Sequence, residues 1–309
     1  MTLFISSFIR PLMVIAALTT AACSALSPNW REGNADHLAY PVSMYPRTET
    51  AEGIEFRVYE RIKGGQDAVI YIEGAEDAMN NYGIRYSFNP TPDDVVALKL
   101  ASFDTYPNMI YMARPCQFRT KVAGYDECPI EKYLGNEMFA PAVISAYQTA
   151  IDQLKIRHHL SNIHLVGYGS GGGIATILAA GRKDVLSLRT IAGLLDTQTF
   201  TRIHNMLDMT GSINPVDMAP HLLNTPQHHY LAQDDALIPS VVYQSYQQAF
   251  FDHSCLSSTY VRTRDGGKDW TAYWTDWSRD IPVCTARAPA TTERAARMEG
   301  VAKDIGPKK

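Results

Sequence analysis

The sequence lacks an internal repeat, a patch of basic residues and the C-x-x-C or H-x-x-x-H spacings of metal ligands. Without a repeat, solenoid and propeller folds are not expected. With 32 acidic and 28 basic residues the formal net charge is −4, so a nucleic-acid partner is not predicted. The missing ligand spacings argue against a metal site, and no cofactor is expected. What remains is a chain of 309 residues, 46% hydrophobic, which can bury the core of one large α/β domain or two smaller ones.

The N-terminal apolar stretch, residues 11–18, is too short for a membrane-spanning helix. Arg10 precedes it and small residues follow it, which is the layout of an export signal over residues 1–22. Removing those residues takes away Arg10 as their only charge and leaves a formal charge of −5.

The four residues Thr20-Ala21-Ala22-Cys23 resemble a bacterial lipobox, in which the cysteine is acylated and becomes the mature N-terminus. Thr20 departs from the leucine usual at that position, and the alternative is an ordinary cleaved signal that leaves an unused cysteine. Within the lipoprotein resemblance, Ser24 is associated with the outer membrane. The prediction is therefore an exported chain, attached to the outer membrane through a lipid on Cys23.

If Cys23 carries lipid, four cysteines remain, and an even number in an exported chain suggests two disulfides. Pairing by proximity gives Cys116–Cys128 and Cys255–Cys284, although three connectivities are possible. A metal site is the weaker competitor.

Residues 23–50 are rich in Ser, Pro and Asn, which is typical of a tether. Beyond them, short apolar and β-branched runs alternate with helical patterns, the clearest helix being 139–154. The predicted strands are 54–60, 68–72, 108–112, 162–166, 187–191, 228–231 and 259–263. This alternation predicts an α/β fold over 51–284, a single domain with a mostly parallel central sheet and helices on both faces. The polar tail, 285–309, is expected to be flexible.

The stretch HLVGYGSGGG, residues 164–173, joins a predicted strand to a predicted helix through a glycine turn. One large class of hydrolases presents its nucleophile on such a turn, and the residues two before and two after the apex must be small. Around Gly169 those neighbours are Gly167 and Gly171, whereas around Ser170 one neighbour is Tyr168. Gly169 is therefore predicted at the apex, with Ser170 opening the helix and its N–H placed as an oxyanion donor. In the alternative the turn slips by one residue and Ser170 is the nucleophile.

Together with this turn, YIEG at 71–74, NPTP at 89–92 and ARPCQF at 113–118 resemble exported or lipid-anchored bacterial members of the α/β-hydrolase superfamily. The resemblance covers residues 54–284, and these relatives are largely uncharacterised. It implies the α/β-hydrolase fold and a catalytic triad in chain order nucleophile, acid, histidine.

The resemblance selects Asp235 as the triad acid, through its spacing to Pro239; the alternative role for Asp235 is a turn carboxylate that caps the following helix. No histidine follows His253, and Asp269, by its spacing to Trp274, stands where relatives carry the histidine. A carboxylate is a poor base for a serine hydroxyl unless burial raises its pKa strongly.

The resemblance also implies that Ala75 supplies an oxyanion donor, although Glu76 and Asp77 would bring negative charge to that site. Aromatic residues follow Asp269, and they form either an apolar platform for a small apolar or acyl ligand or ordinary packing. These residues are Trp270, Tyr273, Trp274 and Trp277.

Three functions remain open. The first is a hydrolase-fold envelope lipoprotein that is catalytically impaired and binds a ligand or partner. The second is an active ester or amide hydrolase that uses Ser170 and Asp235. The third is a structural envelope lipoprotein that retains the fold for its stability.

Overall fold

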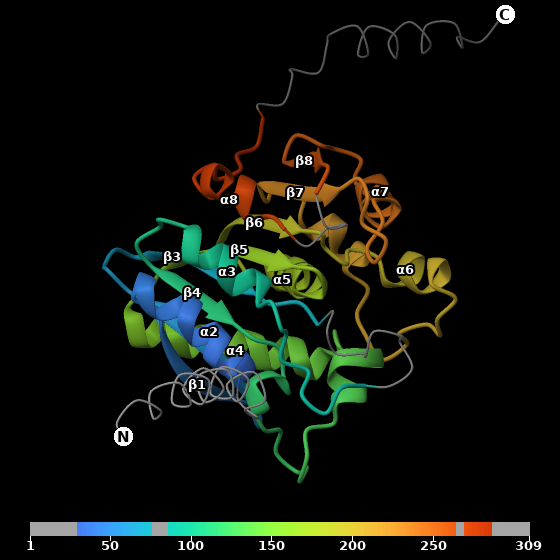
Figure 1. The fold of residues 1–309 in the computed structure, drawn as a ribbon. Helices are drawn as coiled ribbons and strands as arrows, with labels where there is room; N and C mark the ends of the chain where they lie inside the picture. Colours follow the sequence, from blue (N-terminus) through green and yellow to red (C-terminus); the bar gives the residue numbers. More distant parts are fainter. Residues whose placement is uncertain (1–29, 76–85, 264–268, 286–309) are drawn as a thin grey trace, which may run out of the picture.

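The computed structural model describes residues 30–75, 86–263 and 269–285, and these form one eight-stranded sheet between two layers of helices (Figure 1). The strands lie in the order β1-β2-β4-β3-β5-β6-β7-β8. β1 pairs antiparallel with β2, and β2 pairs antiparallel with β4; every other pairing is parallel. The predicted α/β class and mostly parallel sheet are confirmed.

The strands are β1 (Tyr45–Ala51), β2 (Ile54–Arg61), β3 (Asp67–Ile72), β4 (Met109–Met112), β5 (Asn162–Tyr168), β6 (Val185–Ile191), β7 (Gln227–Ala232) and β8 (Leu256–Val261). The α-helices are α2 (Trp30–Ala39), α3 (Val96–Phe103), α4 (Pro141–His158), α5 (Ser170–Gly181), α6 (Thr197–Ile203), α7 (Val241–Gln248) and α8 (Thr271–Trp277). Short helical turns are η1 (Tyr40–Val42), η3 (Gln117–Arg119), η4 (Lys132–Asn136) and η5 (Pro215–His221).

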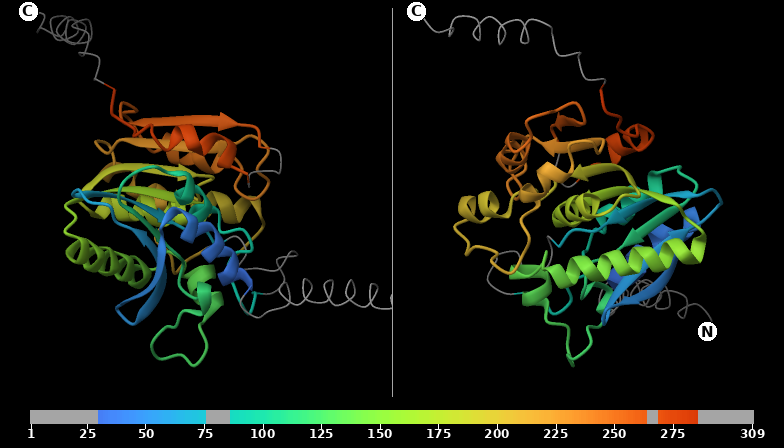
Figure 2. Two further views of the ribbon diagram at one scale, coloured as in Figure 1. Left: turned by 60° about the vertical axis from the view of Figure 1, so that its left-hand side comes forward. Right: turned by 180° about the vertical axis from the view of Figure 1, so that it is seen from behind.

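Two apolar cores lie on opposite faces of the sheet (Figure 2). One core packs α4, α5 and α7 against the strands, and the other packs α2, α3 and α8. β3 supplies both, because Ile70 and Ile72 belong to the first core while Val69 and Tyr71 belong to the second. A strand that is buried on both faces has a continuous run of apolar residues. The run AVIYI, residues 68–72, therefore predicts this strand from the sequence.

The predicted tether differs from the structure. Residues 30–50 contain α2 and most of β1, and β1 completes the edge of the sheet by pairing along its whole length with β2. Glu49 of β1 is 4% exposed, and the cost of burying its charge is offset because both of its oxygens accept hydrogen bonds from Arg157 of α4, at 2.7 and 2.8 Å. The N-terminal segment up to residue 29 and the tail from residue 286 lie outside the described residues.

Candidate functional site

Gly169 stands at the sharp bend between β5 and α5, with φ 54° and ψ −125°. A positive φ is disfavoured for residues with a side chain and is adopted readily by glycine. Ser170 is the first residue of α5 and is not among the residues with positive φ. The bend is therefore centred on Gly169, and the register places no side chain at its apex.

The glycines on either side of the apex bring the helix onto the sheet. A Cβ on Gly167 would collide with the Gly171 carbonyl oxygen, and a Cβ on Gly171 would meet the Glu73 carbonyl oxygen at 2.5 Å. Both contacts are with backbone atoms, which cannot rotate away. The small neighbours therefore serve the close crossing of β5, α5 and the end of β3.

The Ser170 hydroxyl points into the protein and is 4% exposed. Its Oγ accepts a hydrogen bond from the Ala75 N–H at 2.9 Å and from Arg114 Nη1 at 3.3 Å. A hydroxyl oxygen has two lone pairs for accepting hydrogen bonds. The two donors therefore engage the lone pairs with which this oxygen would attack a carbonyl carbon.

The Ala75 N–H lies where an oxyanion donor is expected, and its partner is the chain's own Ser170 Oγ. The loop that carries Ala75 is held on both sides: Gln117 Nε2 donates to the Gly74 carbonyl at 2.8 Å, and a Glu73 oxygen accepts from the Gly74 N–H at 3.0 Å. The Glu73 carboxylate also accepts from the Ala97 N–H at the start of α3. Glu76 and Asp77 lie outside the described residues.

Arg114, which the sequence reasoning passed over, is fully buried after β4. Its Nη2 donates to the Met138 carbonyl at 2.9 Å, and its guanidinium lies 5.8 Å from the centre of the Phe139 ring. The signal in the sequence was a charged residue placed directly after a buried strand. Its position beside Ser170 depends on a contact across 56 residues of chain, which no local pattern reveals.

Asp235 follows β7, as the resemblance implied. Its Oδ1 accepts from the Leu237 and Ile238 N–H groups at 2.8 and 2.9 Å, so the carboxylate closes a turn ahead of α7. Burial raises the pKa of Asp235, and the hydrogen bonds from the Ile238 and Leu237 N–H groups partly oppose this, with a smaller opposing effect of the His204 imidazole. His204 Nε2 in turn lies 2.7 Å from the Leu237 carbonyl oxygen. An imidazole therefore lies near the acid, but it belongs to the end of α6.

Asp269 lies at the start of α8, after the segment 264–268 that the structure does not describe. Its Oδ1 accepts from the Thr271 hydroxyl at 2.6 Å and from the Thr271 N–H at 3.3 Å. This is the local bonding of a helix-start carboxylate. No histidine follows His253 in the chain, so the position after β8 holds no imidazole.

The aromatic residues from Trp270 through the end of α8 pack rather than form an open platform. Trp270 and Trp274 are 1% and 0% exposed, and Trp274 Nε1 donates to the Tyr71 hydroxyl at 2.9 Å. Trp277 is stacked between Tyr230 and Tyr273, at ring distances of 4.4 and 4.9 Å. Of the two predicted roles, packing is the one these contacts support.

The four cysteines form the two disulfides that proximity suggested, Cys116–Cys128 and Cys255–Cys284. Cys23 lies outside the described residues. Over the part of the chain that the structure describes, no helix is long and apolar enough to cross a bilayer, and no three His, Cys, Asp or Glu side chains gather as metal ligands would.

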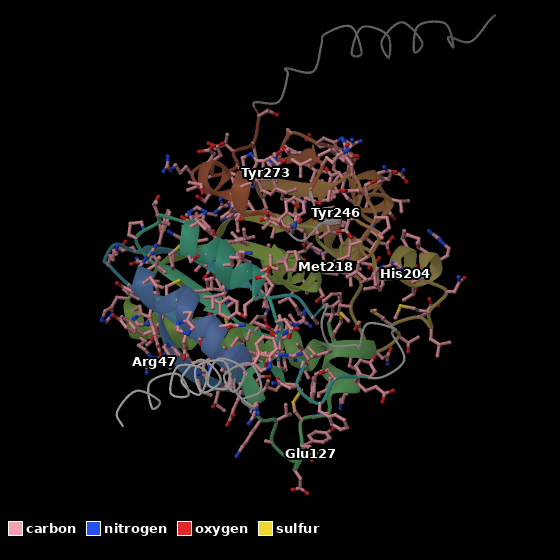
Figure 3. All side chains as sticks on the ribbon, viewed as in Figure 1. Arg47, Glu127, His204, Met218, Tyr246 and Tyr273 are labelled. Carbon is pink, nitrogen blue, oxygen red and sulfur yellow. A yellow bond between two sulfur atoms is a disulfide. The ribbon has the colours of Figure 1, made fainter. Side chains whose placement is uncertain are left out.

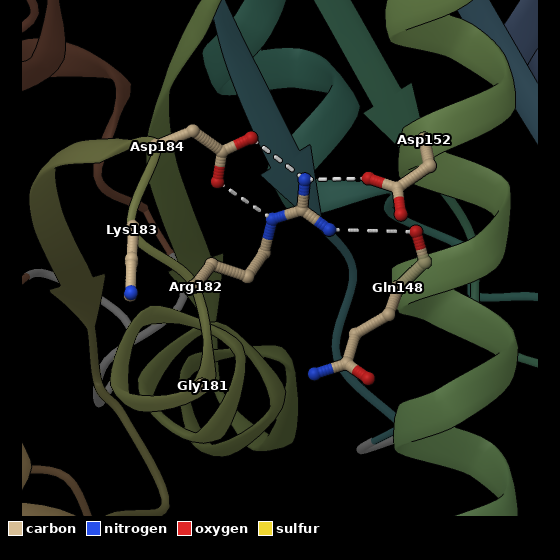
Figure 4. A pocket seen from close by; sticks show the side chains of 6 residues that line it. All are labelled: Gln148, Asp152, Gly181, Arg182, Lys183 and Asp184. Carbon is tan, nitrogen blue, oxygen red and sulfur yellow. Dashed lines mark hydrogen bonds and ion pairs between the residues drawn. The ribbon is translucent and has the colours of Figure 1, made fainter.

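A hollow between α4 and the end of α5 lies at the amino end of β6, away from the bend at Gly169 (Figure 4). Arg182 lies across it, with Nη2 2.7 Å from both Asp152 and Asp184. Lys155 also pairs with Asp184. The two carboxylates of the hollow, Asp152 and Asp184, are thus engaged in ion pairs with Arg182 and Lys155.

The fold is similar to those of solved hydrolase structures. An esterase from Pyrococcus furiosus superposes with a TM-score of 0.52 at 11% identity, over 77% of this chain and 88% of the esterase. A dienelactone hydrolase from Anabaena variabilis gives a TM-score of 0.50 at 12% identity, over 76% and 93% of the two chains. The chain has the α/β-hydrolase fold. No family model matches the sequence, and no curated protein matches it.

Proposed function

We propose that this chain is an exported, lipid-anchored protein of the α/β-hydrolase fold that has lost serine hydrolysis and acts by binding an apolar or acyl ligand or a partner. Export is supported by the signal-like layout of residues 1–22 and by the two disulfides, which persist in oxidising compartments. The lipid would be carried by Cys23, and the outer membrane is the proposed location.

The observation that carries this proposal is the bonding of Ser170. Its Oγ accepts from both Ala75 N and Arg114 Nη1, so the Ser170 hydroxyl occupies the Ala75 N–H that would stabilise an oxyanion. The apex residue, Gly169, has no attacking atom. A bound ester would meet neither a free nucleophile nor a free Ala75 N–H.

The histidine that the resemblance implies after β8 is replaced as well. Asp269 stands at the place of the histidine, and its carboxylate is bonded to Thr271. The residue at the place of the general base, Asp269, thus bonds the first residue of α8.

Binding is supported by exposed apolar side chains near the carboxyl edge of the sheet, where ligands bind in open α/β folds. We call Ile203, Met206, Leu207 and Leu237 the α6 patch; they are 38%, 41%, 92% and 45% exposed. The contact between His204 Nε2 and the Leu237 carbonyl joins the end of α6 to the loop after β7. Neighbouring exposed apolar residues mark ligand or partner sites more often than isolated ones do.

The test is hydrolysis of p-nitrophenyl acetate and butyrate by the purified mature chain, beside its Ser170→Ala variant. We expect the two proteins to show the same rate, indistinguishable from that of buffer. Turnover by the native chain that disappears in Ser170→Ala would refute the loss of serine chemistry.

Binding is tested by calorimetry with octanoate as the probe. Leu207→Ser should weaken binding, whereas Ile156→Ser, which changes a residue 76% exposed on α4, should not. Equal weakening by both variants, or by neither, would remove the α6 patch from the proposal.

A second function, active ester or amide hydrolysis through Ser170 and Asp235, is favoured by one observation. Asp235 and an imidazole, that of His204, both bond the Leu237 backbone: the carboxylate accepts from its N–H at 2.8 Å, and His204 Nε2 lies 2.7 Å from its carbonyl oxygen. This pairing needs Ser170 Oγ to leave Ala75 N and turn toward the carboxyl edge. A Ser170-dependent rate that also falls in His204→Gln would support it.

A further inference from the structure

One surface away from the α6 patch carries exposed aromatic residues. The outer side of α2 and the start of β1 present Trp30, His37, Tyr40 and Tyr45, which we call the α2 face. Tyr40 is 47% and Tyr45 60% exposed, and their ring centres are 6.1 Å apart. Trp30 is half-buried, with the Arg31 guanidinium 5.4 Å from its ring.

The α2 face is the side of the helix that the core does not use. Ala35 and Ala39 are fully buried in the core shared with α3, and they define the inner side of α2. Trp30 and His37 are seven residues apart, two helical turns, so they lie on one side of the helix. Tyr40 continues that side at the end of the helix, so the aromatic residues gather on the outer side.

Trp30, the first residue that the structure describes, belongs to this face. Trp30 is the seventh residue after Cys23, and even fully extended that length of chain spans at most about 25 Å. A lipid on Cys23 would therefore hold the start of α2 within that distance of the bilayer. Tryptophan and tyrosine favour the boundary between water and lipid, because their rings are apolar and their tips are polar.

Arginines flank the aromatic residues. Arg47 follows Tyr45 in β1, with its side chain 50% exposed, and its Nε bonds Glu60 at 2.7 Å. Arg119 is 51% exposed and lies 3.7 Å from Glu32 of α2. Each arginine thus has an acidic partner, so attraction to anionic lipid is a minor contribution and the aromatic rings are the main one.

We propose that the α2 face rests on the surface of the lipid bilayer to which the chain is anchored, and that the α6 patch consequently faces away from that bilayer. This inference rests on the lipid anchor of the proposed function. Arg47 of β1 and His204 at the end of α6 lie at opposite sides of the molecule in Figure 3. In the view from behind in Figure 2, α6 also lies opposite β1. A ligand or partner would then approach from the water-filled side.

The experiment uses the intrinsic fluorescence of the full lipidated chain, reconstituted in vesicles of phosphatidylethanolamine and phosphatidylglycerol with brominated acyl chains. Bromine quenches tryptophan only at short range, and Trp30 is the single tryptophan outside residues 270–277. We expect quenching that disappears in Trp30→Phe and falls at least twofold in the double variant Tyr40→Ser and Tyr45→Ser.

The matched control is Tyr125→Ser, since Tyr125 is 45% exposed and lies outside the α2 face. It should leave quenching unchanged. Intact mass of the same sample reports the lipid on Cys23: an unmodified cysteine would refute the anchor itself. A lipid-modified chain whose Trp30 is not quenched, or whose quenching is the same in the double variant, would overturn the α2 face while leaving the anchor in place.

Discussion

His229 offers a direct test of the packing between β7 and α7. It is fully buried, its Nδ1 lies 2.7 Å from Thr190 Oγ1, and the rings of Tyr243 and Tyr246 lie 5.2 and 5.3 Å from its own. Burial, with a smaller effect of the neighbouring His228, lowers its pKa to about 3. The imidazole is therefore neutral in the folded protein at any mildly acidic pH.

The sign follows from proton linkage. In the unfolded chain this histidine has a pKa of about 6.5, so between that value and the folded value the unfolded state binds the extra proton. Acid must then destabilise the fold. Between about pH 7 and about pH 4.5 the His229 contribution to the free energy of unfolding should fall by roughly 2.5 kcal/mol.

The assay is urea unfolding followed by tryptophan fluorescence, with disulfides intact, for the native chain, His229→Gln and the exposed control His221→Gln. His229→Gln should be less stable near pH 7, because it disturbs a buried contact, yet lose roughly 2.5 kcal/mol less on acidification. His221→Gln should follow the native curve. An identical pH dependence in the native chain and His229→Gln would refute the reasoning.

Three further variants test the bend and its surroundings by the same unfolding assay. Ser170→Ala should cost about 1–3 kcal/mol, because the buried donors of Ala75 and Arg114 lose their acceptor; a neutral effect would mean that the hydroxyl is not bonded as described. Gly171→Ala should cost roughly 3 kcal/mol or more, since its Cβ would meet backbone atoms, and a stable variant would contradict the close crossing. Replacing both Cys116 and Cys128 by Ala should cost about 3 kcal/mol through the released loop, and no loss would mean that this disulfide is absent.

The parts of the fold that the sequence predicts are those buried on both sides or marked by glycine spacing. β3 and β5 are mostly apolar and buried, and their predicted ends agree with the structure within two residues. The sequence predicts the bend at Gly169 because a side chain at position 167 or 171 would collide with backbone atoms. Glycine is therefore needed at both positions, and its spacing is visible in the sequence.

Other parts of the fold and of the site could not be predicted from local sequence, because the contacts that stabilise them come from residues distant in the chain. β1 is an edge strand with a mostly exposed pattern, and its buried Glu49 is explained only by Arg157, 108 residues later. β8 begins at Leu256, three residues earlier than predicted, since Ser257 and Ser258 hide its start. Within the site, the contact between Arg114 and Ser170 could not be predicted either, because 56 residues separate the two in the chain.

The reactivity of Ser170 tests the central claim most directly. The folded mature chain is incubated with a fluorophosphonate probe, and the modified residue is sought by peptide mass spectrometry, with Asp235→Asn as the companion variant. The account predicts no adduct on Ser170, because its oxygen accepts hydrogen bonds from the Ala75 N–H and from Arg114 Nη1. A stoichiometric adduct on Ser170 that Asp235→Asn abolishes would contradict it.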